Sequence, residues 1–152
     1  MTIAKSDKRL LNALQENCRS SSNDLAARAN MSSATCWRKQ KSLEEVGIIT
    51  GYRAILDREK LGYNVCAFTH VSVERQSNDI VENIEKELIK HPSVMECYTA
   101  TGDADFVLRV IAKDMSDYDQ FLNNFIFKLE GVTHVRSNIT LRELKQTTHV
   151  PV

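Results

Sequence analysis

The sequence contains no long apolar run. No stretch approaches the roughly 18 consecutive apolar residues that a membrane-spanning helix needs, and the opening MTIAKSDKRL lacks the apolar core of a signal peptide. With 152 residues, 42% of them hydrophobic and 26% charged, the chain has the composition of a soluble globular protein with one ordinary domain or two small ones. We therefore expect a cytoplasmic protein that does not contact a membrane.

Cysteine and histidine are few and scattered. The four cysteines form no Cys-x-x-Cys pair, and none has a histidine at metal-ligand spacing, which argues against a zinc site or a disulfide framework. The sequence also lacks a glycine-rich nucleotide loop and a serine or cysteine nucleophile with a histidine partner in its sequence context. We therefore expect reduced, mostly buried thiols, no metal, no cofactor and no catalytic activity.

Charge is distributed unevenly along a chain whose net charge is zero. Up to Leu56 there are nine Lys or Arg residues and five acidic ones, a net charge of +4, whereas the rest of the chain has 11 basic and 15 acidic residues, a net charge of −4. A basic first third followed by an acidic remainder indicates two modules, and only the first suits a polyanion such as nucleic acid.

The basic third begins with signals of two short helices. Ser6 or Asp7 can cap a first helix that reaches about Asn17, with leucines at helical spacing on one face. Ser21 followed three residues later by Asp24 resembles a capping box, which predicts a second helix of about two turns. In this second helix, Leu25, Ala26 and Ala29 would face inward.

A third helix follows after a tight break. We expect Ser32 to cap it and Gly47 to terminate it, and Asn30 suits the left-handed turn before it. Two helices joined by about three residues match the helix-turn-helix pattern. The following GIITGYRAILD contains two short β-prone pieces around Gly51, which predict a wing and a connecting strand.

The acidic remainder alternates between strand and helix signals. Its order is strand, helix, strand, strand, helix, strand, over residues 65–74, 77–91, 93–101, 105–112, 115–131 and 132–141. This is the ferredoxin-like split βαβ arrangement, an antiparallel sheet with both helices on one face. The sequence therefore predicts an α+β protein with a winged helix-turn-helix (1–50), a hinge (51–62) and a ferredoxin-like domain (63–152) that dimerises through its open sheet face.

The third helix has a face suited to DNA. Cys36, Gln40 and Leu43 share the inner face, and Arg38 and Lys41 lie opposite. Small residues at the helix start permit close approach to a major groove, Arg38 can reach a guanine edge, and lysines can contact phosphates. The candidate DNA-binding residues are Ser32, Ser33, Ala34, Thr35, Trp37, Arg38, Lys39 and Lys41.

Two questions about this helix stay open at the level of sequence. Trp37 lies between the two faces, so packing against the first helix or the wing competes with a DNA contact. Gln40 on the inner face has no evident reason. A solvated charged helix with no nucleic acid is the alternative for the whole segment.

Together these residues resemble the Lrp/AsnC family, the leucine-responsive and asparagine regulators, over nearly the whole chain. In the first third, the residues that fit the family pattern are Ser32, Thr35, Cys36, Leu43, Glu44, Gly47 and Ile49. The strongest element is GDADF, residues 102–106, which is similar to the family's Gly-Asp-x-Asp-Tyr. Phe106 in place of Tyr and Asn30 in place of Gly are departures. The resemblance implies an amino-acid-responsive transcription regulator that dimerises, often assembles into octamers, and holds its effector in clefts between C-terminal domains.

The GDADF segment can be interpreted as an amino-acid site. Gly102 permits close backbone approach, backbone N–H groups can receive a carboxylate, and Asp103 or Asp105 can accept hydrogen bonds from an ammonium group. By resemblance, further residues line the pocket across the subunit contact. The effector-binding candidates are Thr99, Thr101, Gly102, Asp103, Asp105, Met115, Asn138, Ile139 and Thr140. Met115 and Ile139 favour an apolar amino acid.

Other functions remain open. The aspartates can instead cap backbone N–H groups of a turn or bond across an assembly interface. They can also mimic an acid and base pair, although nothing supplies a reactive substrate group beside them. For the whole protein, we expect a transcription regulator whose dimer binds a roughly palindromic site on double-stranded DNA. The alternative is an architectural DNA-wrapping protein with weak sequence preference, which the ratio of operator to random DNA affinity would distinguish.

Overall fold

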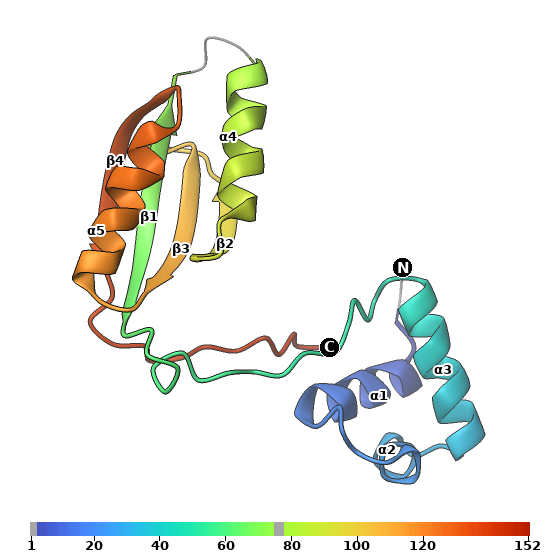
Figure 1. The fold of residues 1–152 in the computed structure, drawn as a ribbon. Coiled ribbons are helices and arrows are strands. Elements are labelled where there is room, and N and C mark those ends of the chain that lie inside the picture. The colour runs from blue at the N-terminus through green and yellow to red at the C-terminus, as the bar shows by residue number, and fades with distance from the viewer. Residues whose placement is uncertain (1–2, 75–77) are drawn as a thin grey trace. The chain divides into compact units, whose positions relative to one another are not determined.

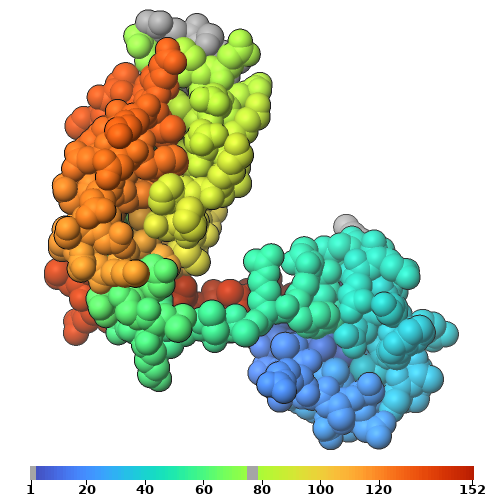
Figure 2. Space-filling model, in the orientation of Figure 1, coloured from blue at the N-terminus to red at the C-terminus, as the bar shows by residue number. Residues whose placement is uncertain are grey.

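The computed structural model describes residues 3–74 and 78–152, which divide into two compact units (Figure 1). One unit holds the described residues up to Ile55 together with Lys145–Val152, and the other is Leu56–Leu144. Side chains fill the space between the elements within each unit (Figure 2). The segment Lys145–Val152 thus groups with the first unit, whereas the sequence pattern predicts a single domain over 63–152.

Three helices form the first unit: α1 (Lys5–Glu16), α2 (Ser22–Ala29) and α3 (Ser33–Glu45). Their apolar faces meet in one core whose buried residues are Leu10, Leu11, Ala13, Leu14, Leu25, Ala26, Ala29, Cys36 and Leu43. All three predicted helices are therefore present, and their packing buries the stripes that the sequence shows at helical spacing.

Local signals set the ends of α2 and α3 as predicted. The Ser21 side chain accepts a hydrogen bond from the Asp24 N–H at 3.2 Å, and Ser32 accepts one from the Thr35 N–H at 3.3 Å. Asn30 between the helices has φ 55° and ψ 58°, the left-handed conformation. Ser21 thus fixes the start of α2, while the left-handed backbone of Asn30 and the Ser32 cap shape the tight turn between α2 and α3.

The predicted cap of α1 is wrong. The helix begins at Lys5, and its N-cap residue Ala4 makes no side-chain cap hydrogen bond. Asp7 lies inside the first turn, and its carboxylate accepts from Lys39 Nζ of α3 at 2.5 Å. The Asp7 carboxylate, which the sequence suggests as a helix cap, thus forms an ion pair between α1 and α3 instead.

The prediction of β-strands around Gly51 is also wrong. Residues 46–64, all of them described, contain no strand. Ile48 and Ile49 pack against the helical core, while Ile55 and Leu56 are 84% and 71% exposed. A two-stranded ribbon alone is marginally stable in water. The first of the two predicted strands instead packs Ile48 and Ile49 against the helices.

The second unit contains the predicted ferredoxin-like arrangement. Its elements are β1 (Val65–Val73), α4 (Asn78–Lys90), β2 (Val94–Thr99), β3 (Phe106–Ala112), α5 (Met115–Asn124), the 3₁₀ turn η1 (Ile126–Lys128) and β4 (Val132–Ile139). The strand order is β2-β3-β1-β4, and all three pairings are antiparallel. Both α4 and α5 lie on one face of the sheet (Figure 1).

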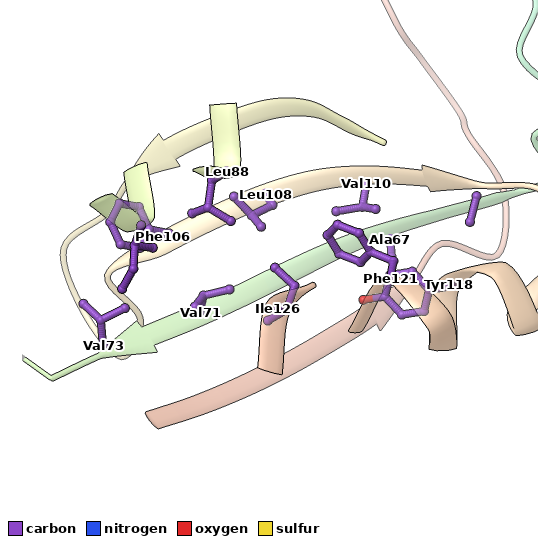
Figure 3. Packing of buried hydrophobic residues seen from close by; sticks show 12 residues of the cluster. Ala67, Val71, Val73, Leu88, Phe106, Leu108, Val110, Tyr118, Phe121 and Ile126 are labelled. Atoms are coloured by element: carbon purple, nitrogen blue, oxygen red, sulfur yellow. The ribbon is translucent and has the colours of Figure 1, made fainter. Parts of the chain in front are cut away.

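Alternation along the strands builds the core of this unit. Phe106, Leu108 and Val110 of β3 are buried and point toward α4 and α5 with alternate residues of β1 (Figure 3). On the opposite face, Phe68 and Tyr98 are 41% and 57% exposed. The sheet therefore has one face covered by its own helices and one that this chain leaves open.

Two helix caps of this unit differ in their outcome. By sequence, Ser116 is the predicted cap of the helix over 115–131, but the structure shows that Asp114 caps α5 by accepting from the Asp117 N–H at 2.9 Å. The helix ends at Asn124 and continues as η1, so the predicted helix 115–131 is divided in two. For α4, the sequence predicts Asn78 or Ser77 as the cap; the helix begins at Asn78, and Ser77 lies outside the described residues.

Candidate nucleic-acid interface and effector site

The exposed face of α3 gathers four of the predicted DNA-binding residues. Ala34, Trp37, Arg38 and Lys41 recur at intervals of three or four residues and are all exposed. Trp37 is 62% exposed, so the alternative that its ring is packed against α1 or a wing does not hold in this structure. One side of a single helix thus presents two cations, an aromatic ring and a small residue near the helix start.

The other four predicted DNA-binding residues are engaged within the unit. Ser32 and Thr35 bond to each other at the helix start, with 2.9 Å between Oγ and Oγ1. Ser33 Oγ donates to Asn23 Oδ1 of α2 at 2.8 Å, and Lys39 is paired with Asp7. These contacts position α3, and they leave Arg38 and Lys41 as its cations directed outward.

A hydrogen-bond network on α3 explains Gln40. Its Nε2 donates to the Tyr52 hydroxyl at 2.7 Å, and that hydroxyl donates to Glu44 Oε1 at 3.0 Å. The Tyr52 hydrogen bond lowers the pKa of Glu44, and burial together with Glu44 raises the pKa of Tyr52. The network ties the extended segment after α3 back to the helix. Helical periodicity did not reveal it, because Tyr52 lies outside any regular element.

In the loop before β3, Asp105 serves the backbone. Its N–H donates to the Val71 carbonyl at 3.0 Å, its carbonyl accepts from the Ala100 N–H at 2.9 Å, and its carboxylate accepts from the Val73 N–H at 2.9 Å. The half-buried Asp105 therefore fastens this loop to the end of β1. This is the backbone-capping alternative that the sequence left open.

Asp103 is placed differently. Its carbonyl accepts from Ser72 Oγ at 3.1 Å, but its exposed carboxylate has no hydrogen bond or ion pair to any residue in the described part of the chain. Gly102 beside it has φ 113°, and a side chain there would meet no atom within 4 Å. Thr99 and Thr101 are also exposed. The open side of the loop thus presents one available carboxylate and a glycine backbone.

The predicted effector residues form two groups in the sheet unit. The loop group, Thr99, Thr101, Gly102, Asp103 and Asp105, lies beside Ser72 and Val73 at one end of β1. Asn138 pairs with Phe68, and the Thr140 N–H and hydroxyl both bond the Cys66 carbonyl, toward the other end.

The two groups are too far apart for one small ligand. At about 3.3 Å per residue, the four residues from Phe68 to Ser72 span about 13 Å, and the six from Cys66 to Ser72 span about 20 Å. Met115 follows β3 and starts α5, beyond the far end of the strand that the loop group precedes. The β4 group, Met115, Asn138, Ile139 and Thr140, therefore cannot share a free amino acid with the loop group of the same chain.

Comparison with known proteins decides the family. A model of the winged helix-turn-helix DNA-binding domain matches residues 3–50, and a model of the Lrp/AsnC ligand binding domain matches residues 66–150. The chain belongs to the Lrp/AsnC family. The Bkd operon transcriptional regulator of Pseudomonas aeruginosa is 36% identical over 146 residues, which cover 96% of this chain and 95% of that protein.

Other relatives of this Lrp/AsnC chain have names that mention amino acids. The leucine-responsive regulatory protein of Rhizobium meliloti is 32% identical, with 96% of this chain and 94% of that protein covered. The crystal structure of a Neisseria meningitidis transcriptional regulator in complex with L-Met has a TM-score of 0.94 and 33% identity, covering 99% of this chain and 97% of that one.

Family membership establishes the class of function. The protein is an Lrp/AsnC-type DNA-binding transcriptional regulator with a ligand-binding domain, and its relatives are regulators rather than enzymes. Within residues 3–74 and 78–152, no group of three or more His, Cys, Asp or Glu side chains is placed to hold a metal ion. Burial raises the pKa of the Cys36 and Cys97 thiols, which favours their less nucleophilic neutral form. None of the described helices is long and apolar enough to span a membrane.

Proposed function

We propose that the exposed face of α3 enters the major groove of double-stranded DNA. The observation that carries this is the exposed stripe of Trp37, Arg38 and Lys41. Lys41 has only an ion pair within α3, to Glu44 at 3.6 Å, whereas Ser33, Lys39 and Gln40 bond to residues outside the helix. Arg38 reads a guanine edge, and Lys41 contacts phosphate. Ala34 lets the start of the helix approach the bases closely.

The protein acts as a homodimer in this proposal. The open sheet face with Phe68 and Tyr98 supports pairing of two copies through their sheets, because a twofold contact buries the same apolar patch on both. Such a dimer presents two α3 helices to a roughly palindromic operator with half-sites about one helical turn apart. Dimers assemble further into an octamer, and the regulator works in the cytoplasm, where its DNA lies.

The effector is a free amino acid, with an apolar one favoured. Asp103 accepts from its ammonium group, the backbone around Gly102 receives its carboxylate, and Met115 and Ile139 contact its side chain. Met115 and Ile139 are 54% and 39% exposed, so both apolar side chains are accessible to a ligand. The distance between the loop group and the β4 group supports a site that takes each group from a different copy.

The DNA proposal is tested by comparing two neighbouring cations. With a DNA fragment selected by the protein from a random pool, Arg38→Ala should weaken binding by about 1–3 kcal/mol and relax the preference at one base. Lys39→Ala, the matched control, removes a cation that is paired with Asp7 and should affect DNA binding less. Equal losses in the two variants would contradict this reading of α3. Near-equal affinity of the wild type for selected and random DNA would favour the architectural alternative.

The effector proposal is tested by thermal unfolding of the protein against each of the twenty amino acids. A ligand at about 100 times its dissociation constant adds about 2.7 kcal/mol to native stability, which shifts the midpoint by several degrees. We expect shifts with apolar amino acids that are absent in Asp103→Ala. Shifts from charged amino acids alone would contradict the proposed class, and no shift from any of them would leave Asp103 as a turn residue.

A further inference from the structure

The chain's last described residues contact α1. Gln15 Nε2 donates to the Val150 carbonyl at 3.0 Å, and the Val150 N–H donates to Gln15 Oε1 at 2.7 Å. Val152 is half-buried and packs against the helical core of the first unit. The segment Lys145–Val152 accordingly belongs to this unit, although it follows the sheet unit in sequence and lies largely within the span of the ligand-binding domain.

The chemistry of this contact is specific. A side-chain amide that bonds both the N–H and the C=O of one residue reproduces the exchange of two bonds between paired strands. Pro151 contributes in two ways: it restricts Val150 to extended backbone, and it has no N–H of its own to compete. Val152 then adds an apolar anchor two residues beyond. A donor and an acceptor on α1 thus match Val150, and the helical core of the unit takes Val152.

We propose that α1 carries a docking site for the chain's own segment Val150–Val152, and that this docking makes the tail a second connection between the sheet unit and the DNA-binding unit. The first connection is the chain after α3. The second begins after β4, directly following Asn138, Ile139 and Thr140, and reaches the docking site across the nine residues 141–149. The strand with predicted effector residues is thereby linked to the first helix of the DNA-binding unit.

Two hydrogen bonds and one valine are enough to dock the tail because the contact is intramolecular. A short flexible linker gives its end an effective concentration on the order of millimolar. A separate peptide with the same three residues would bind α1 weakly. The tail is consequently held but easily released, as a regulatory connection requires.

The test compares Gln15→Met with the wild type. Methionine keeps the length of the side chain and its helix propensity while removing both hydrogen bonds. Gln120→Met makes the same change at an exposed position of α5 where no side-chain hydrogen bond is formed to described residues, and it serves as the matched control. Neither DNA nor an amino acid is added, so failure here is distinct from failure of the proposed function.

Two readouts separate docking from connection. Docking is measured by hydrogen exchange of the Val150 amide, which we expect to be about threefold to tenfold faster in Gln15→Met than in the wild type. Connection is measured by fluorescence anisotropy decay of Trp37, the sole tryptophan, which reports motion of the DNA-binding unit. Release of the tail should increase the amplitude of its nanosecond component.

Each unwanted result overturns one part of the proposal. Unchanged Val150 exchange in Gln15→Met would exclude docking at α1. Faster exchange with an unchanged Trp37 decay would exclude the second connection. A response of the same size in Gln120→Met would also contradict the proposal, since that substitution leaves the docking site intact. A variant that lacks residues 147–152 should reproduce the Trp37 result of Gln15→Met.

Discussion

The candidate binding residues of α3 and those of the sheet unit differ in how close together one chain places them. On α3, one helix gathers Trp37, Arg38 and Lys41 on one face through its own periodicity. In the sheet unit, the candidates are spread over a loop, the start of α5 and the end of β4, and β1 holds the two groups about 13–20 Å apart. The proposed DNA-contacting face therefore lies within one chain, whereas the proposed effector site takes its two groups from two copies.

In both regions, two residues of like charge lie close together in the sequence, and only one of them has a side-chain bond to another element. Lys39 is paired with Asp7 while Arg38 beside it is free of partners in the described chain. Asp105 holds the Val73 N–H while Asp103 faces solvent. In each pair, one side chain is bonded to another element of its unit, and the other is exposed. Substitutions that separate the members of a pair test this division.

The largest effect on the free energy of unfolding is expected from Leu→Ala substitutions in the two separate cores. Leu10 and Leu108 are fully buried, one in each unit, and Leu→Ala at either should cost about 2–5 kcal/mol. Because the units have separate cores, Leu10→Ala should lower the urea midpoint seen by Trp37 fluorescence far more than Leu108→Ala does. Leu144→Ala, at an 83% exposed position, is the control. Equal shifts of the Trp37 midpoint would show a single cooperative unit.

A smaller effect should distinguish the two aspartates. Asp105→Ala leaves the Val73 N–H without its acceptor and should lower the free energy of unfolding by about 1–3 kcal/mol. Asp103→Ala removes no protein contact and should stay within about 0.5 kcal/mol. Urea unfolding of both variants and of Asp105→Asn, which keeps an acceptor, measures this. If Asp103→Ala were the more destabilising, the assignment of roles would be reversed.

The smallest effect is expected from Tyr52→Phe, and it depends on pH. Because the pKa of Glu44 is lowered by Tyr52, its stabilising contribution is present above the ordinary value of 4.5 and is lost as pH falls through the folded-state pKa. Because the pKa of Tyr52 is raised, its contribution is present below 10.0 and is lost as pH rises through the raised pKa.

The measurement is the difference in unfolding midpoint between wild type and Tyr52→Phe from acid to neutral pH. We expect a difference near pH 7 that shrinks as the solution is acidified through the Glu44 transition. Tyr63→Phe, whose hydroxyl makes no hydrogen bond to described residues, should show no such trend. A constant difference across this range would mean that the network does not involve ionised Glu44.

The same comparison explains what could be predicted from the sequence. Helices, caps and strands follow from neighbours in the chain, so Ser21, Asn30 and Ser32 were assigned their local roles correctly. The order of strands followed from the alternating pattern of elements. The family resemblance placed the GDADF segment in the ligand-binding domain, and the matched range 66–150 includes it.

Contacts between distant segments could not be predicted in this way. Lys39 with Asp7, Gln40 with Tyr52, and Gln15 with Val150 join residues that no period or motif relates. The strands expected around Gly51 failed for the same reason, because packing of Ile48 and Ile49 on the helices outweighs local β propensity. The different roles of Asp103 and Asp105 also depend on a tertiary hydrogen bond, the one from the Val73 N–H to the Asp105 carboxylate.

The most direct test of the central claim, that the effector site needs two copies of the chain, is complementation. One variant carries Asp103→Ala in the loop group and the other Asn138→Ala in the β4 group, and each alone should lose the shift in unfolding midpoint caused by the effector amino acid. After mixed refolding in equal amounts, the account predicts that binding returns to about a quarter of the sites, those that take an intact group from each variant. A mixture that stays as inactive as its two components would contradict it.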